Sequence, residues 1–224
     1  MIRLKRVVII GAGGHGREVA DILRHQALAG GKIEPLGFAD DNRDLHGLEL
    51  DGLPVLGDLS WFERANRDDI AVVCAVGAPH INRRLVERAR RIGLSFASAI
   101  SPLANISSFA QLGEGVTIFP NVTINSGGFV DNHSILNVGV VVSHDAKIGP
   151  YSNINPGAQI AGNVTIGEGC YIGMGANVIQ GRSIGAWSVV GAGAAVIRDL
   201  PANVTAVGVP ARTIETREDG WHDR

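Results

Sequence analysis

The stretch that decides the fold is residues 160–172, which read IAGNVTIGEGCYI and carry an aliphatic residue at every sixth position. The spacing continues without a slip over residues 100–196, at Ile100, Ile106, Leu112, Ile118, Ile124, Val130, Leu136, Val142, Ile148, Ile154, Ile160, Ile166, Ile172, Val178, Ile184, Val190 and Val196. A period of six fits neither an α-helix nor plain strand alternation. It fits a chain that turns a corner every hexad and closes one coil every three hexads. The sequence therefore predicts a parallel β-helix.

The repeat also predicts which residues stack on one another. Residues 18 apart should lie in adjacent coils at the strand spacing of about 4.8 Å, which places His144 beside Ser126 and Gly162. Because His144 lies two residues after the inward Val142, we expect its ring to point outward, where Asp145 can orient it. An imidazole beside a carboxylate is a candidate general base, and the Gly162 N–H is a candidate donor to a thioester carbonyl. The alternative is an exposed corner histidine without function.

Ahead of the repeat lies a different kind of sequence. Residues 7–10 (VVII) form an expected strand, the loop Gly11-Ala12-Gly13-Gly14-His15-Gly16 follows, and residues 17–23 have helical spacing. Gly11, Gly13 and Gly16 match G-x-G-x-x-G between a strand and a helix, where backbone N–H groups can hold a phosphate. His15 either donates a hydrogen bond to such a ligand or caps the helix.

The rest of this region predicts a small Rossmann-like fold. A second strand at 36–39 ends at Asp40 and Asp41, where a nucleotide-binding fold presents a carboxylate to a ribose or a base, although a solvated turn is the alternative. We expect a third strand at 71–76, a helix at 83–92 with a solvated basic face, and a fourth short strand at 96–99. About ninety residues are too few for a full dinucleotide fold, so a mononucleotide or a nucleotide-linked ligand is favoured over NAD.

Composition excludes several classes of function. The 224 residues are 45% hydrophobic with a formal net charge of -2, which argues against nucleic acid or an anionic membrane as the main partner. We find no secretory leader and no apolar run that could span a bilayer, so we expect a cytoplasmic protein. Cys74 and Cys170 fall at expected core positions, and neither indicates a disulfide or a metal site.

These motifs together resemble the bacterial hexapeptide-repeat sugar acetyltransferases. The resemblance is to nucleotide-sugar N-acetyltransferases of the bacillosamine and perosamine types, and to relatives described as sialic acid O-acetyltransferases. It is carried by the glycine loop and by the segments SHDAKIG at 143–149, AGN at 161–163 and GVPAR at 208–212. It implies a left-handed β-helix, acetyl-CoA as cosubstrate and His144 with Asp145 as catalytic residues. Residues implied to contact acetyl-CoA are Gly162, Gly208, Pro210, Ala211 and Arg212.

The resemblance also implies a substrate site and an assembly. The residues implied to contact the nucleotide-linked amino sugar are Gly11, Gly13, His15, Asp40, Asp41 and Asn137. Some members carry a second histidine nine residues after the catalytic one, where this chain has Asn153. Members are homotrimers with sites between adjacent β-helices, so a homotrimer is implied here as well.

We therefore expect residues 1–98 to bind the nucleotide sugar, residues 99–212 to form the acyltransferase β-helix, and residues 213–224 to form a charged tail that covers the last coil or frays. The expected reaction moves acetyl from acetyl-CoA to a sugar 4-amine. One alternative is O-acetylation of sialic acid or another sugar hydroxyl, and another is a non-catalytic, trimeric nucleotide-binding scaffold. A zinc hydrase of the γ-carbonic anhydrase kind needs three histidines, and the repeat holds only His133 and His144; we expect no metal.

Overall fold

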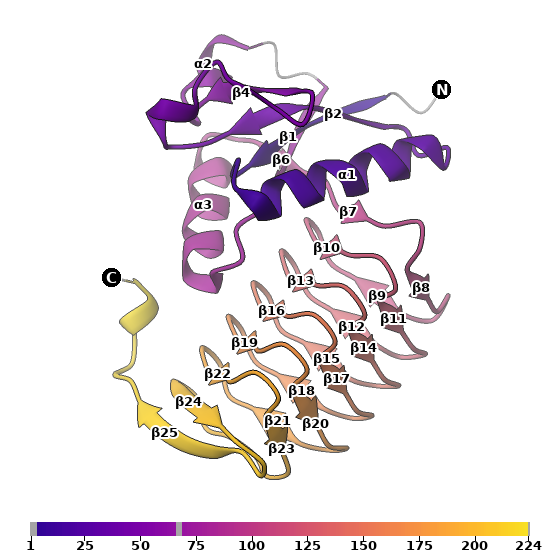
Figure 1. Ribbon diagram of the computed structural model, residues 1–224, viewed down its shortest axis with the longest axis vertical. Helices are drawn as coiled ribbons and strands as arrows, with labels where there is room; N and C mark the ends of the chain where they lie inside the picture. The colour runs from indigo at the N-terminus through magenta and orange to yellow at the C-terminus, as the bar shows by residue number, and fades with distance from the viewer. Residues whose placement is uncertain (1–3, 66–68, 224) are drawn as a thin grey trace.

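The computed structural model describes residues 4–65 and 69–223 of the chain. It shows a small α/β layer set against one end and one side of a long triangular coil (Figure 1). The coil is a left-handed parallel β-helix, and the α/β part is Rossmann-like, as the sequence predicts. No helix within the described ranges is both long and apolar enough to span a bilayer.

The α/β part is built on a six-stranded sheet of order β3-β4-β2-β1-β5-β6. All neighbours pair in parallel except β3 with β4. Alternate residues of β1 face opposite ways, so that Val7 and Ile9 join the core under α1 while Val8 and Ile10 join the core under α3. The elements are β1 (Lys5–Ile10), α1 (Gly14–Leu28), β2 (Ile33–Ala39), η1 (Arg43–Leu45), β3 (Glu49–Leu50), β4 (Leu53–Gly57), α2 (Trp61–Arg64), β5 (Ile70–Cys74), α3 (Pro79–Arg91) and β6 (Ser95–Phe96).

The β-helix consists of two-residue strands that form three parallel sheets. One sheet contains β7 (Ala99–Ile100), β10 (Thr117–Ile118), β13 (Ile135–Leu136), β16 (Asn153–Ile154), β19 (Tyr171–Ile172) and β22 (Val189–Val190). The second contains β8 (Asn105–Ile106), β11 (Thr123–Ile124), β14 (Val141–Val142), β17 (Gln159–Ile160), β20 (Asn177–Val178) and β23 (Ala195–Val196). The third contains β9 (Gln111–Leu112), β12 (Phe129–Val130), β15 (Lys147–Ile148), β18 (Thr165–Ile166) and β21 (Ser183–Ile184).

The register is the one that the six-residue period predicts. Val142 pairs with Ile160 and Ile118 with Leu136, each 18 residues further along the chain. From Ile118 to Val196 the sixth-position aliphatics are buried and form the core. Cys74 and Cys170 are buried as expected, and burial raises the pKa of each thiol to about 12.

Two expectations about the chain's elements need correction, and the β3–β4 hairpin and α2 were not predicted. The single strand expected at 96–99 is divided, because β6 ends the first sheet and β7 begins the β-helix. The β3–β4 hairpin and α2 carry no periodic pattern long enough to predict them. The expectation that the tail frays is wrong for its described residues. Strand β25 (Arg212–Thr216) pairs antiparallel with β24 (Val204–Val207) and extends the first β-helix sheet, and η2 (Trp221–Asp223) follows.

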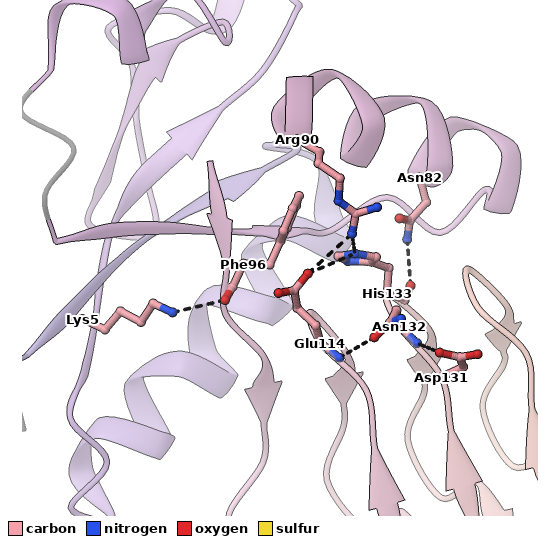
Figure 2. Close-up of polar contacts among 8 residues, drawn as sticks. All are labelled: Lys5, Asn82, Arg90, Phe96, Glu114, Asp131, Asn132 and His133. Carbon is pink, nitrogen blue, oxygen red and sulfur yellow. Dashed lines mark hydrogen bonds and ion pairs between the residues drawn. The ribbon is translucent and has the colours of Figure 1, made fainter. Parts of the chain in front are cut away.

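Helix α3 lies along one corner of the β-helix, and His133 is at the centre of that contact (Figure 2). The His133 side chain is 1% exposed and packs between the rings of Phe96 and Tyr151. An Arg90 Nη2 atom lies 3.1 Å from its Nε2, and because a guanidinium has only donors, Nε2 accepts this hydrogen bond. The Asn82 amide donates to the His133 carbonyl oxygen at 3.4 Å. His133 is therefore a neutral, structural residue that joins the two parts of the chain.

The buried imidazole should make folding stability depend on pH. Burial and the Arg90 cation lower the pKa of His133 from 6.5 to about 4. Between these values the unfolded chain binds a proton that the folded chain does not, so stability decreases as the pH falls through this window. We expect Tm to fall as the pH is lowered from about 6.5 to about 4 and to fall less in His133→Asn. Asparagine suits this backbone, since Asn163 has φ 58° and His133 has φ 57°. If Tm fell as steeply with pH in His133→Asn as in the wild-type protein, His133 would not be the source of this pH dependence.

Candidate active site

His144 and Asp145 form a pair on the surface of the β-helix. They occupy the corner between β14 and β15, and the His144 Nδ1 lies 3.0 Å from a carboxylate oxygen of Asp145. Both side chains are more than half exposed. The Asp145 N–H donates to the Ser126 carbonyl and the Asn163 N–H donates to the His144 carbonyl, which confirms the predicted stacking of adjacent coils. The arrangement holds Nδ1 on the carboxylate and leaves Nε2 for a ligand.

Two glycines in the neighbouring coils make room for this pair. A side chain on Gly162 would place its first carbon 2.5 Å from the His144 ring. A side chain on Gly127 would overlap the carboxylate of Asp145 in the same way. The role of Gly127 was not predicted, although it lies 18 residues before Asp145 and the register contains that information. The observed positions of the imidazole and its carboxylate thus require glycine at both neighbouring positions.

The segment 208–212 lies further along the β-helix. Gly208 accepts from the Ala195 N–H at 3.0 Å, and the Ala211 N–H donates to the Ala195 carbonyl at 2.8 Å. The Val209–Pro210 bond between them is cis. Ala195 begins β23, and β23 lies three coils from β14 in the same sheet. At about 4.8 Å per coil, Gly208, Pro210, Ala211 and Arg212 lie roughly 14 Å from the His144 coil along the axis.

The glycine loop forms one wall of a cavity at the carboxyl edge of the first sheet. This sheet-edge cavity has a volume of about 210 Å³. Gly11 adopts φ 107°, and Gly16 packs so closely that any side chain there would overlap the Gly11 carbonyl. The lining residues come from β1, β2, β4, β5 and α3 or from the segments that follow them: Ile10, Gly11, Ala39, Asp40, Asp41, Leu59, Val76, Ile81, Arg84, Leu85 and Arg88.

The two aspartates at this edge have different partners. The Asp40 carboxylate accepts from the Ala12 and Asn42 N–H groups, each at 2.8 Å, so it fixes the glycine loop to the end of β2. The Asp41 carboxylate is paired with both Nη atoms of Arg88, at 2.5 and 3.2 Å. Both carboxylates therefore have partners in the cavity wall, although the Asp41 side chain remains more than half exposed.

The basic face of α3 was expected to be solvated, and this holds for part of it: Arg84, Arg90 and Arg91 are exposed, but several of its arginines have partners. Arg83 pairs with Glu87, Arg88 pairs with Asp41, and Arg90 contacts His133. Arg84 and Arg88 also line the sheet-edge cavity. The signal was present in the sequence as positions 81, 84, 85 and 88, which share one face of a helix. The sequence does not indicate which element packs against this face of the helix.

His15 does not cap α1, so the capping alternative is wrong. The N-cap is Gly13, without a side-chain cap bond, and His15 lies inside the first turn. Its ring stacks on Phe119 of the β-helix with 5.3 Å between centroids. Its Nε2 is buried without a hydrogen-bond partner in the part of the chain that the structure describes, and burial lowers the pKa of this imidazole. A buried polar atom without a partner in the chain is a candidate hydrogen-bonding group for a ligand.

Comparison with known proteins decides the family. Residues 6–89 match the model of the PglD N-terminal domain. A mutant of perosamine N-acetyltransferase from Caulobacter crescentus, in complex with CoA and GDP-perosamine, is 36% identical, with a TM-score of 0.86 over 95% of this chain and 98% of that one. The chain belongs to the hexapeptide-repeat sugar N-acetyltransferases.

Two further relatives of this acetyltransferase family support the assignment. The acetyltransferase domain of PglB from Neisseria gonorrhoeae is 29% identical, with a TM-score of 0.85 over 94% of this chain and 100% of that one. GDP-perosamine N-acetyltransferase from Escherichia coli O157:H7 is 32% identical over 144 residues. This last match spans 64% of each chain, which is less than two thirds of that enzyme's length.

In this acetyltransferase the remaining expected residues lie at a different corner from His144. Asn137 follows β13 and is stacked one coil beyond Phe119, so it lies near His15. Its own side chain accepts from the Val138 N–H at 2.8 Å. His144 follows β14, the next strand of the same coil, which belongs to a different sheet from β13. Asn137 and His144 therefore lie at different corners of one chain.

Asn153 occupies the position of the second histidine found in some members. It is 4% exposed and donates to the Gly77 carbonyl at 2.7 Å, so it joins the β-helix to the segment after β5. In this acetyltransferase the residue is buried in the contact between the two parts of the chain. Within the described ranges, no three side chains of histidine, cysteine or carboxylate type form a group able to hold a metal ion.

Proposed function

We propose that this protein transfers the acetyl group of acetyl-CoA to the 4-amino group of a nucleotide-linked amino-deoxy sugar. The observation that carries the proposal is the His144–Asp145 pair at 3.0 Å, which faces a coil neighbour, Gly162, without a side chain. A general base needs one ring nitrogen held and the other free, and this corner supplies both. The relatives in complex with CoA and GDP-perosamine act on this class of substrate.

The reaction proceeds by direct attack in this proposal. The neutral sugar amine adds to the thioester carbonyl carbon, and His144 Nε2 removes the proton from the attacking nitrogen. Asp145 stabilises the resulting imidazolium, and the Gly162 N–H donates to the oxyanion of the tetrahedral intermediate. The carbon–sulfur bond then breaks, the amide remains on the sugar, and the CoA thiolate takes the proton from His144. No covalent enzyme intermediate is needed.

The sheet-edge cavity is the proposed nucleotide site. Gly11, Asp40 and Asp41 line it, Gly13 begins the adjoining helix, and Arg84 with Arg88 adds positive charge suited to phosphate. His15 and Asn137 then lie on the path from this cavity toward the β-helix. We assign Gly208, Pro210, Ala211 and Arg212 to the CoA groove, since Gly208 and Ala211 are hydrogen-bonded to Ala195 of β23, which belongs to the same sheet as the strand before His144.

A homotrimer completes the site in this proposal. Because Asn137 and His144 occupy different corners of one β-helix, a neighbouring copy that sets its corner after β13 against the corner after β14 would join the two halves. We place the enzyme in the cytoplasm, since Cys74 and Cys170 are free buried thiols of the kind that reducing compartments preserve.

A thiol-release assay tests the reaction and the acceptor together. Acetyl-CoA is supplied with UDP-, GDP- and dTDP-linked 4-amino sugars, and with free sialic acid as the hydroxyl acceptor. We expect CoA release with at least one amino sugar and none with sialic acid. Release with sialic acid alone would replace N-acetylation by O-acetylation. Absence of release with every acceptor would favour the scaffold alternative.

A further inference from the structure

The last described residues form a structured contact that the proposed chemistry does not use. Residues 217–223, here called the C-terminal strap, leave β25 and return toward helix α3, as the yellow end of the chain shows in Figure 1. The Arg217 N–H donates to the Asn203 carbonyl at 2.7 Å, and the Asn203 amide donates to Asp219 at 2.6 Å. The Arg217 guanidinium lies 4.7 Å from the Trp221 ring centroid. The start of the strap is thus fixed to the final coil.

The far end of the C-terminal strap contacts both parts of the chain. His222 stacks on Trp187 with 3.8 Å between centroids and 4° between ring planes. Trp187 is itself seated on the β-helix, because its ring lies where any side chain on Gly169 would be. The Arg83 guanidinium of α3 lies over the Trp187 ring, 5.6 Å from its centroid, and is paired with Asp223 at 3.3 Å. The strap therefore joins α3 to the end of the β-helix.

The stacked pair is better buried than the ion pair at the end of the strap. The His222 side chain is only 11% exposed, whereas that of Asp223 is 63% exposed. An exposed ion pair contributes little to stability, but a buried ring stack contributes beyond its burial. His222 is consequently the residue whose removal should release the C-terminal strap from Trp187.

Helix α3 connects this contact with the sheet-edge cavity. Ile81, Arg84, Leu85 and Arg88 recur at helical spacing and line the cavity. His80, Arg83 and Glu87 recur on another face, where His80 approaches Trp221 and Arg83 approaches Asp223. A helix moves as a rigid body over this length, so a change in the contact face displaces the cavity face.

We infer that the C-terminal strap is a positioning element for nucleotide binding, which acts by fixing α3 so that Arg84 and Arg88 keep their places in the sheet-edge cavity. The inference rests on the proposed function of that cavity. His222 touches neither the cavity nor His144, so it acts through α3 alone. Arg90, near the other end of the same helix, contacts His133, and Asn82, next to Arg83, donates to the His133 carbonyl (Figure 2).

The kinetic test compares His222→Ala with His222→Phe, which keeps a flat ring on Trp187. With the amino sugar that the wild-type enzyme acetylates, we expect KM for this substrate to rise about three- to tenfold in His222→Ala. The kcat and the KM for acetyl-CoA should stay within about twofold, because His144 and the CoA groove are untouched. His222→Phe should restore the wild-type KM. A parallel rise in both KM values, or no rise in either, would overturn the inference.

Hydrogen exchange provides a readout that does not depend on turnover. The α3 amides should exchange faster in His222→Ala than in the wild-type protein and in His222→Phe, with α1 amides as the internal reference. Unchanged protection of α3 would overturn the inference. If the wild-type protein acetylates no acceptor in the panel, the proposed function fails, and the exchange data still decide whether the C-terminal strap fixes α3.

Discussion

His144→Ala is expected to lower kcat by about 10²- to 10⁴-fold, the contribution that a general base typically makes. The sugar amine carries an extra proton in the tetrahedral intermediate, and without the imidazole that proton has to leave to water. The side chain is more than half exposed, so its removal leaves no cavity in the core and the fold should persist. Steady-state rates at saturating acetyl-CoA and amino sugar measure the effect.

Two matched variants sharpen this test. His25→Ala removes an exposed histidine from α1 and should leave kcat unchanged. Asp145→Asn keeps an oxygen acceptor beside the Nδ1 of His144 but removes the charge that stabilises the imidazolium, so it should lower kcat by less than His144→Ala does. Near wild-type turnover of His144→Ala, with an unchanged Tm, would exclude His144 as the base.

Gly16→Ala is expected to lower the free energy of unfolding by about 3 kcal/mol, at the upper end of the cost of overpacking. The new methyl group would overlap the Gly11 carbonyl oxygen, and neither the strand end nor the first turn of α1 can move without breaking their hydrogen bonds. The same shift would open the sheet-edge cavity, so the KM for the nucleotide sugar should rise. Chemical denaturation measures the first effect, and initial rates measure the second.

Gly13→Ala is the matched control for stability. Gly13 lies three residues away in the same loop, and a side chain there would meet nothing within 4 Å. Its φ of -72° suits alanine. We therefore expect a much smaller change in unfolding free energy for Gly13→Ala. Equal destabilisation by the two substitutions would show that the close approach of Gly16 to Gly11 is not what limits the loop.

Most of the β-helix and half of the active site could be predicted from the sequence. The six-residue period defines the coil, and three hexads per coil define an 18-residue register. Because no loop of variable length interrupts the hexads, this register can be read directly from the sequence. His144 beside Gly162 follows from that register alone, and Gly127 beside Asp145 follows from the same arithmetic. The strand–loop–helix at Gly11 to Gly16 could be predicted as well, because glycine spacing and strand periodicity are local signals.

Contacts between side chains far apart in the sequence could not be predicted in this way. Asp41 meets Arg88 within the α/β part, His15 meets Phe119 between the two parts, and Trp187 meets His222 between the β-helix and the C-terminal strap. No period relates these positions, so the basic face of α3 and the charged tail look solvated in the sequence. Their partners depend on the tertiary packing of the chain.

The sequence by itself determined the coil, its register, the outward histidine with its carboxylate, and the phosphate-binding loop, because each follows from backbone geometry repeated at a fixed spacing. Only the tertiary structure decided which side chains line the sheet-edge cavity, that His15 stacks on Phe119, and that the C-terminal strap packs against Trp187 and helix α3. Those features depend on side chains that are far apart in the sequence and meet only in the folded chain. Such contacts are set by tertiary packing and not by any periodic signal along the chain.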